Sequence, residues 1–599
     1  MRLALIATVK VLLLAPSSYS CADHDHEYTH HRRGDSSLDI TPPWRHLEWG
    51  DINIIQTTDS HGWLLGHQKR SPPEPNYSGN FGDFFSFVKH MRQIAIERDV
   101  DLLVVDSGDL HDGTGLSDGY PPGGVDAHDS NEFFQQLPYD ALTVGNHELY
   151  YYNYAFDMFK NFVPRFNGRY LASNVNIIVN NSTGHPVSVP FGSRYAKFTT
   201  RKERRITALG ILFNFSGNAT NTTVQTVGEM VHETWFAEAI KEEPDFFLLL
   251  GHMPVSRQRT DKWKCDDKDL DQWPCVFHAI REVHPQTPIL IFGGHTHVRN
   301  CTQLDDNSMS LMSGRYMETV GWMSANLTEK DKPTFTRRYL DANRVTYEYH
   351  TNQSEIMYNT VQGVSITQGL NDLYERFGLG SPYPSNTSLL SELVDKALPY
   401  SLRVNNTDKN MHNIILINSG SMRFDIYRGT FDRNDQWSTT YFNSKFQYIA
   451  NVNRSIAEQV LPYLNGTRPL EREFEELEGR GEVEHIYRKS LQHISERLED
   501  RDDLTLGYVT KDFCPGLGDD TLHKRLVAYD APRYIGSPTP NVPANATIDL
   551  VFLDHFASKV VDALNAILKK KVYKPSDVKD YTSLLVNQVW GVYAEGNWP

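Results

Sequence analysis

Residues 288–297 read Pro-Ile-Leu-Ile-Phe-Gly-Gly-His-Thr-His, a short apolar run that ends in two glycines and two histidines. The apolar run predicts a buried strand, and the glycines allow the backbone to turn sharply where the strand ends. Two imidazoles one residue apart at such a turn can reach two neighbouring metal ions. His295 and His297 are weak evidence alone, because histidines in solvated loops are common.

Four earlier apolar segments carry the same signature. The segments 52–57, 101–106, 141–144 and 246–250 each predict a strand, and residues able to bind a metal follow each one. A helical pattern at 84–97 separates the first two strands, which is the layout of an α/β domain. Ligand sites gather at the carboxyl ends of the strands in such sheets. We therefore expect a single metal cage built from Asp59, His61, Asp109, Asn146, His252, His295 and His297.

The ligand types predict a dinuclear centre. Asp109 follows a central strand and is expected to bridge two divalent cations. Mixed oxygen and nitrogen ligands favour Zn, Mn or Fe over Mg or Ca. The remaining ligands are expected to divide between the two ions as Asp59, His61 and His297 for one, and Asn146, His252 and His295 for the other.

Such a centre would supply its own nucleophile. A hydroxide that bridges both ions would have its pKa lowered by both charges. Phosphoryl displacement would then need no nucleophilic side chain. We expect His147, which follows the ligand Asn146, to face the phosphate and to stabilise or protonate the leaving oxygen.

Length and charge limit the class of protein. A chain of 599 residues is too long for one hydrophobic core, so two domains are expected. The net charge of -16 argues against a nucleic-acid-binding surface, which would need a basic face. A small anionic substrate remains compatible, because bound cations reverse the sign of the charge locally.

The order of segments predicts a secretory protein. A positive start, an apolar run and small residues predict a signal peptide at 1–20, followed by a flexible leader at 21–47. The metal domain is expected at 48–345, a linker at 346–380 and a second domain at 381–599. No membrane anchor is expected, because no later run is long and apolar enough. We predict a mature protein in the secretory pathway, either secreted or in the vacuolar lumen.

Glycosylation motifs and cysteines support that compartment. After cleavage near Cys21 an even number of cysteines remains, which favours disulfides in an oxidising compartment. Cys265 with Cys275 closes a short loop and is the favoured pair, which leaves Cys301 with Cys514. N-linked glycans are expected, because Asn-x-Ser/Thr occurs at Asn76, Asn180, Asn181, Asn214, Asn218, Asn221, Asn300, Asn326, Asn352, Asn386, Asn405, Asn453, Asn465 and Asn545.

Five short motifs together resemble the calcineurin-like metallophosphoesterases: Asp59-x-His61, Gly108-Asp109, Gly145-Asn146-His147-Glu148, Gly251-His252 and Gly293-Gly294-His295-Thr296-His297. Gly113-Thr114 and the run at 418–429 are similar to the secreted 5'-nucleotidase group. The resemblance implies an α/β fold with a four-layer αββα metallophosphoesterase domain, followed by a smaller α/β 5'-nucleotidase-type C-terminal domain. It also implies hydrolysis of nucleotide phosphate esters or of related diesters.

Substrate contacts are also implied by the resemblance. The group grips its substrate with an asparagine and an arginine, which match Asn418 and Arg423 here, and stacks the base on an aromatic wall that Phe442 matches loosely. A surface salt bridge for Arg423 and plain packing for Phe442 are the alternatives.

One departure from the group concerns the residue that orients His147. The 5'-nucleotidases usually place an aspartate three residues after this histidine, and this chain has Tyr150 there. Protein phosphatases of the same superfamily keep the orienting aspartate three residues after the bridging one, where this chain has Asp112. We therefore predict an Asp112–His147 pair.

The sequence thus predicts a 5'-nucleotidase-like phosphomonoesterase that acts on a small phosphoester, expected to be a nucleotide. A phosphodiesterase or pyrophosphohydrolase acting on nucleotide sugars or cyclic nucleotides is the first alternative. A secreted binding protein that keeps the fold without activity is the second, and the complete ligand set argues against it.

Overall fold

The structure is a computed structural model of the chain. It describes residues 40–255, 265, 269–327, 333–383, 393–404, 412–427, 430–440, 442–466, 504–506, 510, 512–524 and 532–598. The predicted signal peptide at 1–20 and most of the predicted leader lie outside the described residues. Within the described part of the chain, no helix has the length and apolar character needed to cross a bilayer.

The first sheet contains the strand that opens the metal domain. It has six strands in the order β15-β14-β1-β2-β3-β4: β15 (Thr334–Asp341), β14 (Thr319–Asn326), β1 (Ile52–Thr57), β2 (Asp101–Asp106), β3 (Ala141–Thr143) and β4 (Tyr170–Leu171). Strand β1 runs parallel to β2, with Ile52 opposite Asp101 and Thr57 opposite Asp106. This register brings the ends of β1 and β2 level, so the loops that follow them meet.

The second sheet supplies the remaining predicted ligand loops. Its order is β12-β13-β11-β10-β8-β7: β12 (Arg299–Thr302), β13 (Ser308–Ser313), β11 (Ile289–Phe292), β10 (Phe246–His252), β8 (Arg205–Leu212) and β7 (Tyr195–Thr199). Strand β10 runs parallel to β8 and β11. Buried side chains from both sheets share one core, for example Ile54 of the first with Leu248 and Phe292 of the second.

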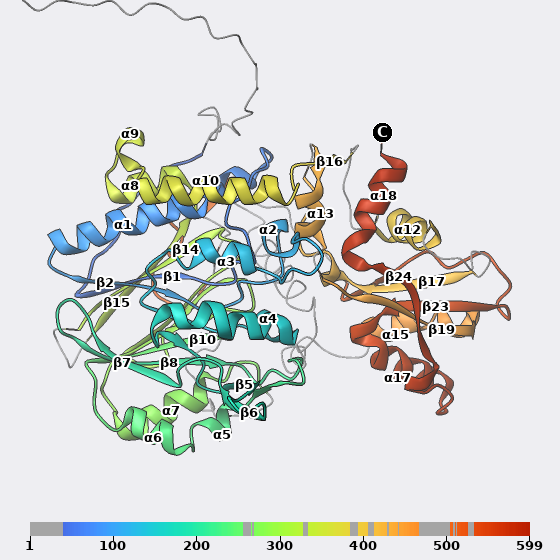
Figure 1. The fold of residues 1–599 in the computed structure, drawn as a ribbon, viewed down its shortest axis with the longest axis horizontal. Helices are drawn as coiled ribbons and strands as arrows, with labels where there is room; N and C mark the ends of the chain where they lie inside the picture. Colours follow the sequence, from blue (N-terminus) through green and yellow to red (C-terminus); the bar gives the residue numbers. More distant parts are fainter. Residues whose placement is uncertain are drawn as a thin grey trace, which may run out of the picture. The chain divides into compact units, whose positions relative to one another are not determined.

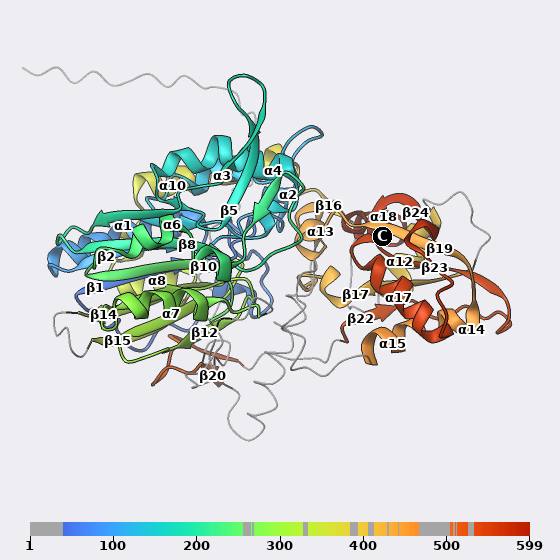
Figure 2. The ribbon, with the colours of Figure 1, turned by 90° about the horizontal axis from the view of Figure 1, so that it is seen from below.

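Helices cover the outer faces of both sheets. Figure 1 shows α1 (Phe81–Glu97), α8 (Arg344–Thr351) and α10 (Val361–Arg376) beyond the first sheet. Figure 2, seen from below, shows α6 (Thr234–Ile240) and α7 (Trp273–Val283) over the second sheet. The predicted four-layer αββα arrangement is therefore confirmed.

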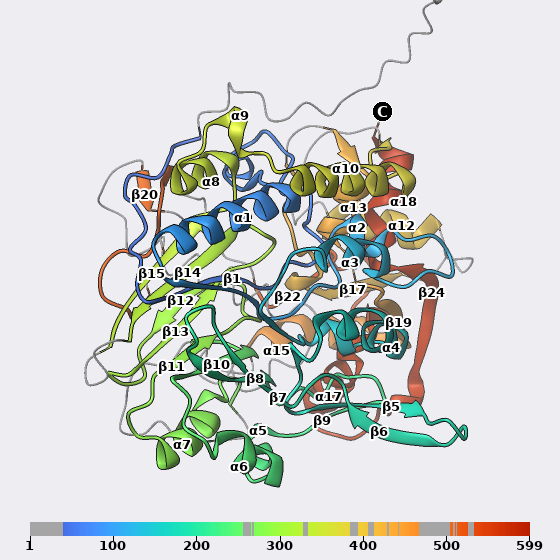
Figure 3. The ribbon, with the colours of Figure 1, turned by 60° about the vertical axis from the view of Figure 1, so that its left-hand side comes forward.

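Short elements surround this sandwich. They are α2 (Gly115–Asp118), α3 (His128–Phe134), α4 (Tyr152–Asp157), α5 (Val227–Met230) and the three-stranded sheet of β6 (Pro186–Pro190), β5 (Val175–Asn180) and β9 (Thr222–Val224). Figure 3 shows the β5–β6 hairpin extending from the domain.

Local sequence explains where α1 begins. The pattern predicted a helix from 84, but the helix starts at Phe81. Asn80 is the N-cap, and its side chain accepts hydrogen bonds from the backbone N–H groups of Gly82 and Asp83. Asp83 in turn accepts from the Asn80 N–H, which completes a capping box.

The segment expected as a linker, 346–380, is mostly helical and packs on the metal domain. Helix α10 buries Ile366, Leu370 and Leu373 in the first core. Thr367 Oγ1 donates to Asn80 Oδ1 at 2.7 Å, which joins α10 to the start of α1. The polar, tyrosine-rich composition concealed these helices, because their apolar stripe is narrow.

The C-terminal domain is built on a five-stranded sheet with helices on both faces (Figure 1). The strand order is β22 (Tyr534–Gly536), β17 (Asn413–Asn418), β23 (Thr547–Leu553), β19 (Lys445–Asn453) and β24 (Val578–Leu585). The helices are α12 (Leu398–Val404), α15 (Val460–Gly466), α17 (Ala557–Leu568) and α18 (Val589–Asn597). The α/β class predicted for this domain is confirmed.

One predicted element of this domain is wrong. The sequence pattern of 551–571 predicts one long amphipathic helix, but the structure has a strand followed by a helix there, because the branched and aromatic run at its start belongs to the central strand β23. Both predicted disulfides are present, with Cys265 bonded to Cys275 and Cys301 bonded to Cys514.

Candidate metal centre

The loops that follow β1, β2, β3, β10 and β11 meet at one edge of the two sheets. Six of the seven predicted ligands form two groups in which possible ligand atoms lie within 4.8 Å of one another, and all six are buried. One group is Asp59, His61 and His297; the other is Asp109, His252 and His295. These groups are the two ligand sets expected from the sequence, apart from Asn146. A further group of His61, Asp109 and His147 links the two.

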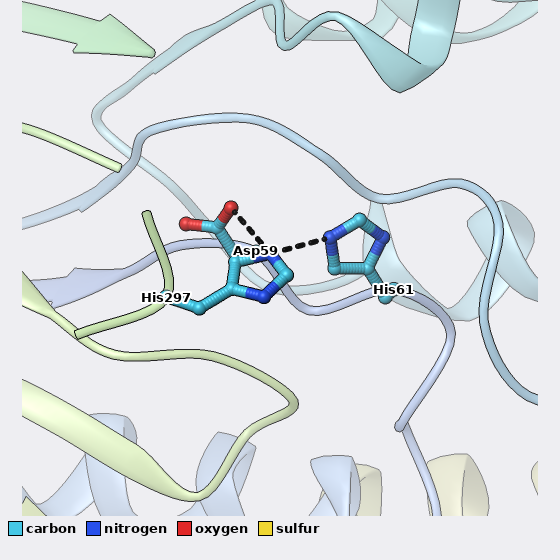
Figure 4. A group of neighbouring side chains, drawn as sticks. All are labelled: Asp59, His61 and His297. Carbon is cyan, nitrogen blue, oxygen red and sulfur yellow. Dashed lines mark hydrogen bonds and ion pairs between the residues drawn. The ribbon is translucent and has the colours of Figure 1, made fainter. Parts of the chain in front are cut away.

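The first group is compact. Figure 4 shows the imidazole of His297 between Asp59 and His61. His297 Nε2 lies 3.3 Å from Asp59 Oδ1 and 3.2 Å from His61 Nε2. The nearest polar atoms of all three side chains therefore converge on one point.

Asp109 lies between the two groups. Its Oδ2 is 3.7 Å from His61 Nε2 in the first group and 2.9 Å from His252 Nε2 in the second. His252 Nε2 is also 3.7 Å from Asp59 Oδ1. A single carboxylate oxygen with imidazoles of both groups at this range has the position expected of a bridging ligand.

Asn146 joins the second group through its neighbour. The backbone N–H of His147 donates to Asp109 Oδ1 at 2.9 Å, which brings the Asn146–His147 turn against the bridging carboxylate. Asn146 Nδ2 donates to the hydroxyl of Tyr150 at 3.1 Å, and Asn146 Oδ1 is buried with no hydrogen-bond partner among the described residues. The amide oxygen is therefore available as a ligand.

The backbone at these loops is strained. Asp59, His61, Asp109, His295 and His297 all have positive φ, between 44° and 77°. Non-glycine residues rarely adopt this left-handed region, at a cost of about 1–3 kcal/mol each where the conformation is sparsely populated. Strain concentrated on the predicted ligands indicates a functional constraint on where their side chains lie.

Glycines beside the ligands leave space for them. A Cβ atom at Gly145 would lie 2.1 Å from Asp109 Oδ1, and one at Gly294 would lie 2.5 Å from Thr58 Oγ1 and 3.0 Å from Asp59 Oδ2. Any side chain at either position would displace a predicted ligand. Glycine is therefore needed at these positions, because the backbone passes close to the carboxylates.

Backbone carbonyls fix the orientation of two imidazoles. His61 Nδ1 lies 2.6 Å from the carbonyl oxygen of His111, and His252 Nδ1 lies 2.8 Å from that of Ser107. A carbonyl can only accept, so each Nδ1 carries the proton, and Nε2 of the neutral ring presents a lone pair to the centre.

Glu148 is a supporting residue to which the sequence reasoning assigned no role. Its buried carboxylate accepts from the backbone N–H groups of Leu110 at 2.6 Å and Gly145 at 2.7 Å, and from that of Asp109 at 3.2 Å. It therefore clamps the loop after β2 to the loop after β3. Its place in the motif Gly145-Asn146-His147-Glu148 is the feature of the sequence that could have indicated this role.

Two further observations show that the residues fit metal ions. Both ring nitrogens of His295 are buried and have no hydrogen-bond partner among the described residues, an arrangement that costs free energy unless a ligand binds. Burial lowers the pKa of His295, and also that of His297, well below the usual range, so both rings are neutral, as metal ligation requires.

The buried carboxylates of Asp59 and Asp109 need a compensating positive charge. Burial raises the pKa of Asp59 to about 7. Burial opposes the charged form of His252, but Asp109 and Asp59 outweigh it and raise the pKa of His252 to about 10. A protonated imidazole therefore compensates the carboxylates here, and divalent cations would supply that compensation in its place.

The predicted pair of His147 and Asp112 is present. His147 Nδ1 lies 2.7 Å from Asp112 Oδ2, and both side chains are buried. His147 Nε2 is 3.8 Å from Asp109 Oδ2, so the ring extends from Asp112 toward the centre. Tyr150 packs edge-on against His147, with 4.8 Å between ring centroids.

The predicted substrate residues lie on the C-terminal domain. Asn418 ends β17, and Arg423 is buried with its guanidinium 5.4 Å from the centroid of the Phe442 ring. Burial is the main cause of the lowered pKa of His297, and the positive charge of Arg423 is the next. Arg423 therefore lies near the first group. The Phe442 ring is only 3% exposed and stacks at 6.0 Å on His147, so its predicted role as a wall for a base stays a prediction.

Comparison with known proteins defines the class. Residues 52–299 match the model of the calcineurin-like phosphoesterases, and residues 378–561 match that of the NAD nucleotidase C-terminal domain. The fold and the loops that carry the predicted ligands are therefore those of a calcineurin-like phosphoesterase joined to a nucleotidase-type C-terminal domain.

Relatives narrow this class to a family. An uncharacterized protein of Schizosaccharomyces pombe is 34% identical, over 96% of this chain and 94% of its own length. A secreted protein of Arthroderma benhamiae is also 34% identical, over 93% and 92%. The crystal structure of 5'-nucleotidase from Candida albicans matches with a TM-score of 0.80 at 32% identity, over 93% of this chain and 100% of that chain. This chain belongs to the 5'-nucleotidase family of calcineurin-like phosphoesterases.

Proposed function

We propose that the protein is a dinuclear metal-dependent phosphomonoesterase that hydrolyses nucleotides. The observation that carries this proposal is the pair of buried ligand groups with the Asp109 carboxylate close to an imidazole of each. Similarity to the Candida albicans 5'-nucleotidase supports the substrate class. Asp59, His61 and His297 would hold one divalent cation and Asn146, His252 and His295 the other, with Asp109 between them.

The two cations, when bound, would lower the pKa of a water molecule and neutralise phosphate charge. The protein's own residues would orient the reaction. Asp112 accepts from Nδ1 of His147 and so holds the ring in one tautomer, which leaves Nε2 directed toward the centre. His147 would donate a proton to, or hydrogen-bond, the oxygen that leaves with the nucleoside.

Arg423 would bind the phosphate. Its guanidinium is always charged and offers a planar fork of donors that suits a phosphate. Asn418, five residues earlier, is proposed to contact the substrate as well. Stacking on Phe442 would need its ring to become accessible, because the described conformation buries it.

A pyrophosphohydrolase of dinucleotides is a second candidate function. The observation that favours it is the match of residues 378–561 to the NAD nucleotidase C-terminal domain. The same ligand groups could serve either reaction, since both break a phosphorus–oxygen bond at a dinuclear centre.

A substrate panel would separate the two. Purified protein loaded with Mn²⁺ or Zn²⁺ would be given AMP, NAD, a UDP-sugar, a 2',3'-cyclic nucleotide and an aryl phosphate. The proposal predicts release of free phosphate from AMP. It predicts little cleavage of NAD, the UDP-sugar and the cyclic nucleotide, because these lack a terminal phosphate. Preferential cleavage of NAD would favour the second candidate, and no turnover of any substrate would contradict both.

We also propose that the protein enters the secretory pathway and carries N-linked glycans. The two disulfides fit an oxidising compartment, and one relative is named a secreted protein. Asn181 lies exposed after β5, where a glycan would have room. Treatment with an endoglycosidase should lower the apparent mass of the protein made in a eukaryotic host, and Asn181→Gln should remove part of that shift.

A further inference from the structure

Another group of acidic side chains lies behind the His147–Asp112 pair. Asp112, Asp118 and Asp126 each place a carboxylate oxygen within 4.8 Å of the other two, and all three are buried. Their side chains come from the segment between β2 and β3: Asp118 ends α2 and Asp126 precedes α3. None of the predicted ligands belongs to this group.

Hydrogen bonds position these carboxylates without neutralising them. Asp118 Oδ2 accepts from the backbone N–H of Gly113 at 2.5 Å and from Ser117 Oγ at 2.7 Å. Asp126 Oδ1 accepts from the N–H of Asp112 at 3.4 Å. No described Lys or Arg forms a salt bridge with Asp112, Asp118 or Asp126. The His111 imidazole does pair with Asp126, at 2.9 Å from its Oδ1, and Asp126 raises the pKa of His111 to about 9 against the opposing effect of burial.

Three buried carboxylates at this spacing need more positive charge than the single His111 imidazolium supplies. Burial and then the neighbouring Asp126 and Asp112 carboxylates raise the pKa of Asp118 well above its usual range. Either a shared proton or a bound cation would remove the repulsion. The geometry around Asp126 distinguishes these two possibilities.

Two features of that geometry favour a cation. Asp126 is fully buried, and its Oδ2 has no hydrogen-bond partner among the described residues. His111 Nδ1 lies 2.9 Å from Asp126 Oδ1, yet neither ring nitrogen of His111 makes a hydrogen bond of acceptable angle. The two atoms are close, but they are not aligned as donor and acceptor.

The metal centre shows the same arrangement. His252 Nε2 lies 2.9 Å from Asp109 Oδ2 and likewise makes no hydrogen bond there. An imidazole nitrogen and a carboxylate oxygen that approach side by side are placed as two ligands of one ion. The contact of His111 with Asp126 therefore resembles the contact between two ligands in the proposed dinuclear centre.

We propose that Asp112, Asp118 and Asp126 form a third cation site, with His111 at its margin. Carboxylate oxygens predominate, so the site would take a hard divalent cation such as Ca²⁺ or Mn²⁺. Its consequence rests on the proposed function: a cation bound by Asp112 would fix the position of this carboxylate, which accepts the hydrogen bond from Nδ1 of His147. Asp118 and Asp126 would then be positioning residues for His147.

Metal content tests this site. The full chain would be saturated with Mn²⁺, freed of excess ion and analysed by elemental mass spectrometry. We expect three ions per chain in the wild type and two in Asp126→Asn. Asp101→Asn is the matched control, because Asp101 is an equally buried carboxylate that pairs with Thr200 and Arg204 at the far end of β2, and it should retain three.

The outcomes separate the two proposals. Two ions in saturated wild type, or three in folded Asp126→Asn, would overturn the third site and leave the proposed function intact. Fewer than two ions in the wild type would contradict the dinuclear centre itself. If Asp126→Asn fails to fold, anomalous diffraction from Mn²⁺-soaked wild-type crystals decides instead, with a peak among the three carboxylates expected and its absence contrary to the proposal.

Discussion

At the scale of single residues, His147 is held by one carboxylate and faces another. Asp112 Oδ2 bonds Nδ1, while Nε2 points toward Asp109. If His147 protonates the leaving oxygen, its importance should depend on how basic that oxygen is. His147→Ala should lower kcat on AMP by about 10²–10⁴-fold, and lower it much less on an aryl phosphate, whose leaving oxygen needs no proton.

Steady-state kinetics on both substrates would check this, with the exposed His185→Ala as the control. Asp112→Asn should also lower kcat on AMP more than on the aryl phosphate, because the amide cannot hold the Nδ1 proton as a carboxylate does. Equal losses of kcat on the two substrates would show that His147 is no proton donor.

Tyr150 is expected to tune metal binding. Its hydroxyl accepts from Asn146 Nδ2, which turns the amide oxygen toward the centre. Residues that orient a ligand are worth about 10–100-fold in metal affinity, so Tyr150→Phe should weaken binding of one ion to that extent. Tyr152→Phe, which loses only a bond to the Ile178 carbonyl, is the control. Unchanged affinity in a calorimetric titration of Tyr150→Phe would remove this role.

Metal binding should release protons. The pKa of His252 is raised to about 10 by Asp109 and Asp59 despite burial, so the ring is protonated at pH 8 in metal-free protein. A ligating imidazole must be neutral. Calorimetry at pH 8 in two buffers of different ionisation enthalpy should therefore report about one proton released from His252 per chain. Buffer-independent heats would contradict this account of the site.

At the scale of elements, the loop after β3 depends on Gly145. A methyl group there would lie 2.1 Å from Asp109 Oδ1, so Gly145→Ala should displace the bridging carboxylate and abolish binding of two ions. Gly466→Ala is the control, because no atom of the described residues lies within 4 Å of a Cβ at that position. Elemental analysis checks both variants, and a full metal complement in folded Gly145→Ala would contradict the close approach.

Much of this architecture could be predicted from the order of the sequence. The strands β1 and β2 follow from mostly apolar runs that are followed by residues able to bind a metal, and a parallel register brings their loops together. The left-handed backbone of Asp59 and His297 could not be predicted, because aspartate and histidine adopt positive φ in only a small minority of cases. Tertiary contacts impose it here. The strand β23 was predicted as part of a helix, since a short apolar run fits either period.

At the scale of the whole molecule, a segment from the second half of the sequence packs on the metal domain. Cys514 is bonded to Cys301 of β12, and Asp519 forms a buried ion pair with Arg299 at 3.1 Å. The Tyr339 N–H donates to the Gly518 carbonyl at 3.0 Å. The disulfide could be predicted by pairing the cysteines. The ion pair of Asp519 could not be predicted, because its partner Arg299 is 220 positions away in the sequence.

This covalent tie should matter for stability rather than for the centre. Removing a disulfide typically costs about 2–5 kcal/mol in small domains, so Cys301→Ser with Cys514→Ser should lower the melting temperature clearly. The ion pair of Arg299 and the ligand loops would remain, so metal content should not change. A thermal scan and elemental analysis of the double variant check this. A loss of metal without a lower melting temperature would show that the disulfide supports the metal centre and not the stability of the protein.

The central claim is that Asp109 bridges two cations, and anomalous diffraction at the metal absorption edge tests it most directly. Crystals of zinc- or manganese-loaded protein should show two peaks about 3.5–4 Å apart, one beside Asp59, His61 and His297 and the other beside Asn146, His252 and His295. A single peak, or two peaks that do not share Asp109, would contradict the account.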